Sequence, residues 1–120
     1  MTKIMIVEDN LHARQALTAL LSLQDNVQET MEASNGLEAI NSIKKQIPDL
    51  VLMDMRMPVM DGLEATRIIK QNWPQIKIVV MTLYSEHQSD ALSAGADAFL
   101  IKGCSTEMMM SSIHNLIHAG

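Results

Sequence analysis

Short apolar runs rich in β-branched residues alternate along the chain with longer segments in which apolar positions recur every three or four residues. Runs of four apolar residues occur at 4–7, 50–53 and 78–81, and each is followed at once by a polar side chain. Such continuous runs are typical of strands buried on both faces of a parallel sheet. Two further strands are predicted at the edges of the sheet, at the more polar segment 27–33 and at 98–101.

The segments between these strands are amphipathic and predict helices. The third helix is expected to end before Trp73, a short fourth covers about 85–94 and stops at Gly95, and Ser105 is placed to cap the last, with Gly120 just beyond it. The inward faces are marked by Ala13, Ala16, Leu17, Leu20 and Leu21, by Leu37, Ile40, Ile43 and Ile47, by Leu63, Ala65, Ile68 and Ile69, and by Met109, Ile113, Leu116 and Ile117. Strand–helix alternation repeated five times predicts one α/β domain, (βα)5, with helices on both faces of a five-stranded parallel sheet.

The composition fits one globular domain with an aliphatic core. The chain has 120 residues, of which 48% are hydrophobic, 19% charged and 2% aromatic, and eleven are methionine. The net charge of −5 argues against nucleic acid as a direct partner, because phosphate backbones require clustered lysine and arginine. A lone cysteine, Cys104, cannot form an internal disulfide, and no apolar run is long enough to span a bilayer. We therefore expect a cytoplasmic protein without a membrane segment.

Five chemically reactive side chains follow the predicted strands. Glu8 and Asp9 come after the first strand, Asp54 after the third, Thr82 after the fourth and Lys102 after the fifth. In open parallel sheets ligands bind beyond the carboxyl ends of the strands, so these groups are expected to converge. Two unit charges about 4 Å apart repel by roughly 4 kcal/mol at an effective dielectric near 20, so three carboxylates together require either a compensating cation or a raised pKa. Oxygen ligands without histidine or cysteine indicate Mg²⁺.

A carboxylate nucleophile beside Mg²⁺, with lysine and threonine donors, suits phosphoryl transfer. Asp54 is the best candidate nucleophile because it ends the central strand and precedes the sharp turn 55–58. Any one of these residues alone could be an ordinary loop or capping residue. Their occurrence together, in fitting chemical types at the strand ends, favours a functional site.

The chain resembles the receiver domains of two-component response regulators, in particular those of the NarL/FixJ-like branch. The resemblance rests on segments 4–10, 49–62, 79–82 and 95–102 and runs through nearly the whole chain, while 102–105 and the closing residues 118–120 indicate the branch. It implies a flavodoxin-like, doubly wound fold for residues 1–120. It also implies that Asp54 accepts a phosphoryl group from a sensor histidine kinase.

The same resemblance implies a role for each site residue. Asp9 and Asp54 would bind Mg²⁺ directly, Glu8 would assist through water, and the backbone carbonyl of Arg56 would be a further ligand. The phosphoryl oxygens would be gripped by Thr82 and Lys102.

Phe99 occupies the switch position of the family and would turn into space that Thr82 vacates. The sequence departs from the commonest pattern in three places. Glu8 replaces an aspartate, Gly103 stands where many members have proline, and Phe99 lacks the hydroxyl of a tyrosine.

Members of this branch carry a C-terminal helix-turn-helix domain, so the resemblance implies a transcriptional output domain absent from this chain. We also expect phosphorylation to promote a homodimer through the fourth helix, the fifth strand or the fifth helix, with apolar contact from Met108–Met110. A stand-alone receiver that binds a protein target is an alternative. A Mg²⁺-dependent phosphatase is another, although the second acid that such enzymes usually carry two residues after the nucleophile is here Arg56. The intact set of site residues speaks against an inactive receiver. We expect self-catalysed phosphoryl transfer and autodephosphorylation, not turnover of a separate substrate.

Two bulky side chains are expected to flank the mouth of the site. Arg56 lies two residues after Asp54, and Tyr84 lies two residues after Thr82. Neither is a good base at neutral pH, and both can cover the approach of water. The pattern therefore predicts slow self-dephosphorylation.

Overall fold

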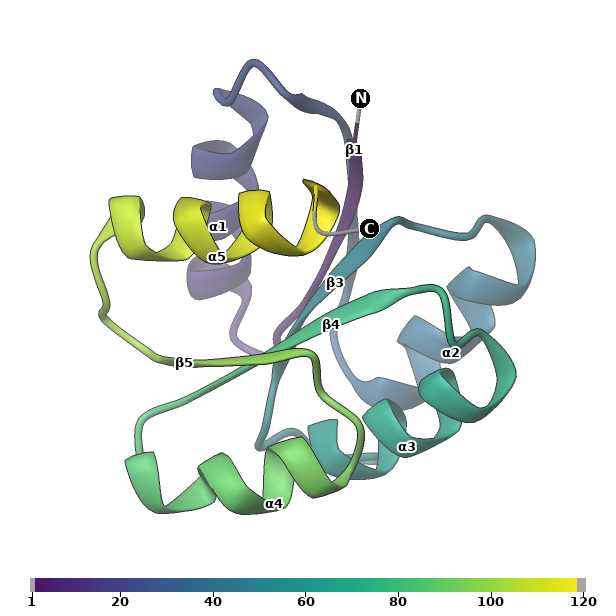
Figure 1. Cartoon of the computed structure of the whole chain (residues 1–120). Helices are drawn as coiled ribbons and strands as arrows, with labels where there is room; N and C mark the ends of the chain where they lie inside the picture. Colours follow the sequence, from purple (N-terminus) through teal and green to yellow (C-terminus); the bar gives the residue numbers. More distant parts are fainter. Residues whose placement is uncertain (1, 119–120) are drawn as a thin grey trace.

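Five parallel strands form one sheet in the computed structural model, which describes residues 2–118 (Figure 1). The order across the sheet is β2-β1-β3-β4-β5, so β3 is central and β2 and β5 are the edges, as predicted. All four strand pairs are parallel, and the fold is the predicted (βα)5 arrangement. The strands are β1 (Thr2–Val7), β2 (Val27–Ala33), β3 (Leu50–Asp54), β4 (Lys77–Thr82) and β5 (Ala98–Ile101).

Helices cover both faces of this sheet. α1 and α5 lie on one face, and α2, α3 and α4 lie on the other (Figure 1). Their apolar side chains form one core on each face. The helices are α1 (Leu11–Ser22), α2 (Gly36–Lys45), α3 (Gly62–Asn72), a 3₁₀ turn η1 (Ser85–His87) leading into α4 (Gln88–Ser93), and α5 (Thr106–His118). Within residues 2–118, no helix combines the length and apolar character needed to cross a membrane.

The continuous apolar runs arise because successive side chains of a strand point to opposite faces and both faces are covered. In β1, Met5 and Val7 belong to the core on the face covered by α2, α3 and α4, whereas Ile4 and Ile6 belong to the core on the face covered by α1 and α5. β3 divides its side chains in the same way. Two aliphatic layers therefore fix β1 and β3 side by side at the centre of the domain.

Three side chains that the periodicity placed on inward helix faces lie at the surface instead. Ala16 of α1 is exposed, and Leu37 and Ile47 are 44% and 48% exposed. Gln46 ends α2 with extended backbone (φ −149°, ψ 119°), so Ile47 no longer follows the helical period. Leu37 lies in the first turn of α2. The remaining inward positions are buried or partly buried, which confirms the main helical faces.

Polar residues after the strand ends also start the next helices. The side chains of Asn10, Asn35 and Asp61 accept hydrogen bonds from the backbone N–H three residues on, and so cap α1, α2 and α3. Capping satisfies N–H groups that have no partner inside the helix. The carboxyl end of the sheet thus carries both the residues that cap helices and the candidate site residues.

The two helix ends predicted from glycine and serine are confirmed. Gly95 follows α4 with φ +106°, and the N–H groups of Gly95 and Ala96 donate to carbonyls of the last turn. Left-handed backbone of this kind favours glycine. Ser105 Oγ accepts from the N–H of Met108 at 3.1 Å and caps α5. Gly120 lies outside the described residues.

The first and last described residues lie at the amino ends of the strands. Thr2 and His118 line the same cavity of about 320 Å³ there. Glu8 and Asp54, by contrast, lie at the carboxyl ends of β1 and β3. Thr2 and His118 therefore lie at the opposite end of the strands from the predicted site.

Candidate functional site

The three predicted carboxylates converge at the carboxyl ends of β1 and β3. Glu8, Asp9 and Asp54 each place a carboxylate oxygen within 4.8 Å of the others. The convergence follows from strand pairing. Val7 of β1 lies opposite Met53 of β3, and the acids Glu8 and Asp54 are the next residues along the chain. Glu8 and Asp54 are only 5% and 7% exposed, whereas Asp9 faces solvent.

Lys102 supplies a cation to this acidic group. Its Nζ lies 2.9 Å from Asp54 Oδ1 and 3.0 Å from Glu8 Oε1. Burial by itself lowers the pKa of the Lys102 ammonium, but the hydrogen bonds to Asp54 and Glu8 outweigh burial and raise it. Lys102 follows β5, and its backbone N–H donates to the carbonyl of Thr82 at 2.7 Å. Among residues 2–118 no peptide bond is cis, so the peptide from Lys102 to Gly103 is trans.

The carboxylates still outnumber the ammonium that contacts them. Although Asp9 is exposed, its limited loss of water contact is the largest cause that raises its pKa, and a hydrogen bond and the negative charge of Glu8 raise it further; a backbone hydrogen bond and Lys102 act in the opposite direction. The donors of the cluster are carboxylate oxygens, which are the ligands that a hard divalent cation prefers. The acidic cluster therefore has the charge and the donor set of a metal site.

A cavity of about 410 Å³ adjoins the three carboxylates and is lined by the predicted phosphoryl-transfer residues. Asp54, Thr82 and Lys102 line it, together with Arg56 and Tyr84. Arg56 and Tyr84 are both exposed, and their covering of the approach to Asp54 stays a prediction. The structure thus brings together all the side chains proposed for the chemistry of the site.

The loop after Asp54 folds back tightly on the strand. A Cβ at Gly62 would clash with the backbone oxygen of Asp54, so only glycine fits this close approach. The Gly62 N–H donates to the carbonyl of Met55 at 2.8 Å. Within this loop Val59 has a positive φ, an unusual conformation for a β-branched residue. The start of α3 is therefore held against the backbone that carries Asp54.

Thr82 and Phe99 lie on the same face of neighbouring strands. Thr82 pairs with Ile101 across β4 and β5, and Phe99 pairs with Val80. Because alternate residues share a face, Phe99 lies diagonally next to Thr82 on the side covered by α4. Phe99 is partly buried against the core on that side.

Two contacts of the site residues were missed from the sequence, and the first belongs to Thr82. Its Oγ1 lies 3.1 Å from Nδ1 of His87, at the end of η1. The available signal was a histidine five residues after the threonine at a strand end, but that spacing indicates no contact until the path of the loop is known.

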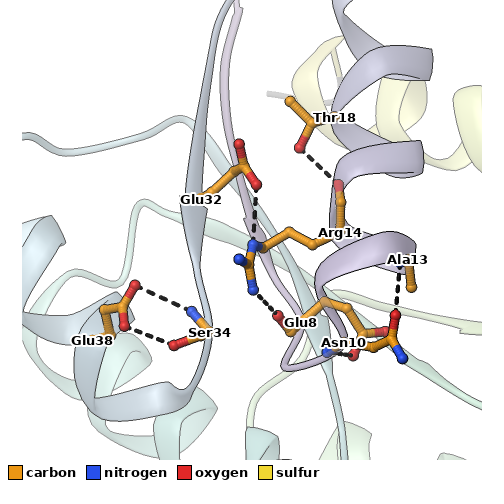
Figure 2. A network of polar contacts seen from close by, with 8 residues as sticks. All are labelled: Glu8, Asn10, Ala13, Arg14, Thr18, Glu32, Ser34 and Glu38. Carbon is orange, nitrogen blue, oxygen red and sulfur yellow. Dashed lines mark hydrogen bonds and ion pairs between the residues drawn. The ribbon is translucent and has the colours of Figure 1, made fainter.

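The second is a clamp on the backbone of Glu8 (Figure 2). Arg14 Nη1 donates to the carbonyl oxygen of Glu8 at 2.7 Å, and Arg14 Nε donates to Glu32 Oε1 at 3.0 Å. The N–H of Asn10 also donates to Glu8 Oε2 at 3.2 Å. One guanidinium therefore ties α1, the end of β1 and β2 together behind the acidic cluster.

Comparisons with known proteins agree with this geometry. The family model described as the response regulator receiver domain matches residues 4–114. The transcriptional regulatory protein YhcZ of Bacillus subtilis (strain 168) is 39% identical over 120 residues, a match that covers 98% of this chain and 55% of YhcZ. The chain spans about half the length of the curated relatives it matches.

Solved structures give the same result. A DNA-binding response regulator of the LuxR family from Staphylococcus aureus superposes with a TM-score of 0.91 at 28% identity, covering 98% of this chain and 100% of that one. The response regulator TrrA of Thermotoga maritima, in complex with Mg²⁺-BeF, has a TM-score of 0.88 at 30% identity, covering 97% and 99%. The resemblance seen in the motifs is confirmed, and the chain belongs to the response regulator receiver domain family.

Proposed function

We propose that this receiver domain accepts a phosphoryl group on Asp54 from a phosphohistidine of a sensor histidine kinase. A carboxylate oxygen of Asp54 would attack phosphorus, so that a phosphorus–oxygen bond forms while the phosphorus–nitrogen bond breaks. The leaving imidazole nitrogen keeps the electron pair and takes a proton from solvent. The observation that carries the proposal is the position of Asp54, buried at the end of the central strand between an ammonium and two further carboxylates.

The acidic cluster is the proposed Mg²⁺ site. Asp9 and Asp54 would hold the ion directly, with the backbone carbonyl of Arg56, and Glu8 would assist through water; the three clustered carboxylates support the assignment. When bound, Mg²⁺ neutralises charge on the carboxylates and on the oxygens of the transferring group. Lys102 already contacts Asp54 Oδ1, so it is placed to pair with a phosphoryl oxygen carried by that residue.

Thr82 and Phe99 would convert phosphorylation into a change of shape. Thr82 lines the cavity beside Asp54, and its hydroxyl would donate to a phosphoryl oxygen once it turns toward the site. Because Phe99 lies diagonally next to Thr82, this turn would free space for the aromatic ring. The added phosphoryl charge acts locally, so a movable element of this kind is needed to carry the signal outward.

Labelling with a small phosphodonor tests the proposal. Incubation with acetyl phosphate and Mg²⁺ should add the mass of one phosphoryl group to the wild type and nothing to Asp54→Asn. Asp25→Asn removes an exposed carboxylate at the other end of the sheet and should label like the wild type. Chelation of the metal should abolish labelling, because uncompensated carboxylates repel an incoming phosphate. Undiminished labelling of Asp54→Asn would exclude this residue as the acceptor.

The full-length protein is proposed to control transcription from the cytoplasm, through a C-terminal helix-turn-helix domain outside this chain. Support comes from the relatives, which are about twice as long as the match and include proteins named as transcriptional regulators. The receiver itself would not contact DNA. Its phosphorylation would promote a homodimer through α4, β5 or α5, where Met108 offers an exposed apolar side chain. Equal sedimentation with and without beryllofluoride, which mimics the acyl phosphate, would contradict dimerisation.

A further inference from the structure

The Thr82 hydroxyl is already held by another side chain. Thr82 is buried, its Oγ1 lies 3.1 Å from Nδ1 of His87, and the N–H of Tyr84 donates to the same oxygen at 3.4 Å. His87 is fixed in turn, because its backbone N–H donates to the carbonyl of Tyr84 at 3.2 Å and its ring packs edge-on against that of Tyr84, with centroids 5.5 Å apart. Contacts among Thr82, Tyr84 and His87 therefore hold the segment from the end of β4 to η1 in one conformation.

This arrangement competes with the switch motion described above. A threonine hydroxyl has one proton to donate, so a hydroxyl that donates to His87 Nδ1 cannot also donate to a phosphoryl oxygen. In the other tautomer of His87 the ring donates to Oγ1 and still tethers it. In both cases Thr82 must give up the contact with His87 before it turns toward Asp54.

We propose that His87 is a positioning residue that holds Thr82 in its unphosphorylated orientation and so opposes activation of the receiver. The inference rests on the proposed function, since it assigns His87 to the switch of the same site. His87 is the N-cap residue of α4, but its side chain makes no capping hydrogen bond, so a capping role does not explain its position. His87 lines another cavity, of about 430 Å³, together with Arg56 and Asp90. Its ring is therefore bordered by open space and not embedded in the core.

Binding of beryllofluoride in the presence of Mg²⁺, measured by titration calorimetry, tests the inference on this chain. His87→Ala should bind beryllofluoride about fivefold more tightly than the wild type, because one hydrogen bond no longer has to be broken. A fivefold change corresponds to about 1 kcal/mol. His87→Asn places an amide group near the position of Nδ1 and should restore an affinity close to the wild type. Glu86→Ala, an exposed change in the same 3₁₀ turn, should bind like the wild type.

A double-mutant cycle separates positioning from a general structural effect. With Thr82→Val there is no hydroxyl to release, so adding His87→Ala should leave beryllofluoride affinity unchanged. His87→Leu fills the volume of the ring without a hydrogen bond, and should repeat the gain if His87→Ala folds poorly. Suppose that the wild type binds beryllofluoride, and that neither His87→Ala nor His87→Leu binds it more tightly than the wild type does. The inference is then wrong, while the proposed function stands. If the wild type fails to bind beryllofluoride with Mg²⁺, both are overturned.

Discussion

Arg14 offers the sharpest test of how the acidic cluster is held in place. In Arg14→Ala the carbonyl of Glu8 loses a donor at 2.7 Å and Glu32 loses its ion pair. A hydrogen bond from a charged group contributes about 1.5–3 kcal/mol. The ion pair adds less than about 1 kcal/mol, because the Glu32 side chain is 42% exposed while that of Arg14 is 15% exposed. We therefore expect the free energy of unfolding to fall by about 2 kcal/mol, most of it from the lost hydrogen bond.

Urea denaturation in chelated buffer measures this loss. With an m-value of about 2 kcal/mol per molar, the midpoint should fall by about 1 M urea at unchanged slope. Glu32→Ala is the matched control, since it removes the ion pair and leaves the bond to Glu8, and it should cost less than half as much. The reasoning fails if Glu32→Ala is as destabilising as Arg14→Ala, or if Arg14→Ala unfolds at the wild-type midpoint.

Two further predictions concern the charge and the lifetime of the site. In metal-free buffer at neutral pH, Asp9→Asn should raise the urea midpoint, because the pKa of Asp9 is raised by burial and by Glu8. A carboxyl whose pKa is higher in the folded state destabilises that state when ionised, and this cost disappears as pH falls through the raised pKa toward its ordinary value of 3.8. The gap between variant and wild type should therefore close as pH falls toward that value, and a constant gap would contradict the assignment. Replacing Arg56 and Tyr84 together by alanine should speed loss of the acyl phosphate about tenfold, if their occlusion contributes roughly 1.4 kcal/mol to the barrier. Decay of the acyl phosphate at the wild-type rate would show that these side chains do not set its lifetime.

The sequence allowed the sheet and the acidic cluster to be predicted because both follow from periodicity and topology. Residues after parallel strands meet at one edge, so Asp54 and Lys102 could be brought together without knowledge of any side-chain conformation. The inward faces of the helices were predicted less accurately, because a periodic pattern does not show at which residue a helix ends. Ile47 was misplaced for this reason.

The contacts of Arg14 and His87 could not be predicted, because each depends on a particular side-chain conformation. An arginine in the first turns of an amphipathic helix fits a solvated position as well as a clamp on the preceding strand. The approach of His87 to Thr82 depends on a 3₁₀ turn that brings the ring back over the strand end. The sequence pattern alone carries no information about such side-chain contacts.

The shared location of Thr2 and His118 has a consequence for engineering this domain. Both line one cavity at the amino ends of the strands, and the whole length of β1 separates that cavity from Glu8. A fluorescent reporter fused at either end would therefore leave the acidic cavity accessible to a donor protein. Joining the ends by a short flexible linker should also be tolerated, so that new termini opened in the exposed turn after Leu23 would give a circular permutant with an unaltered site.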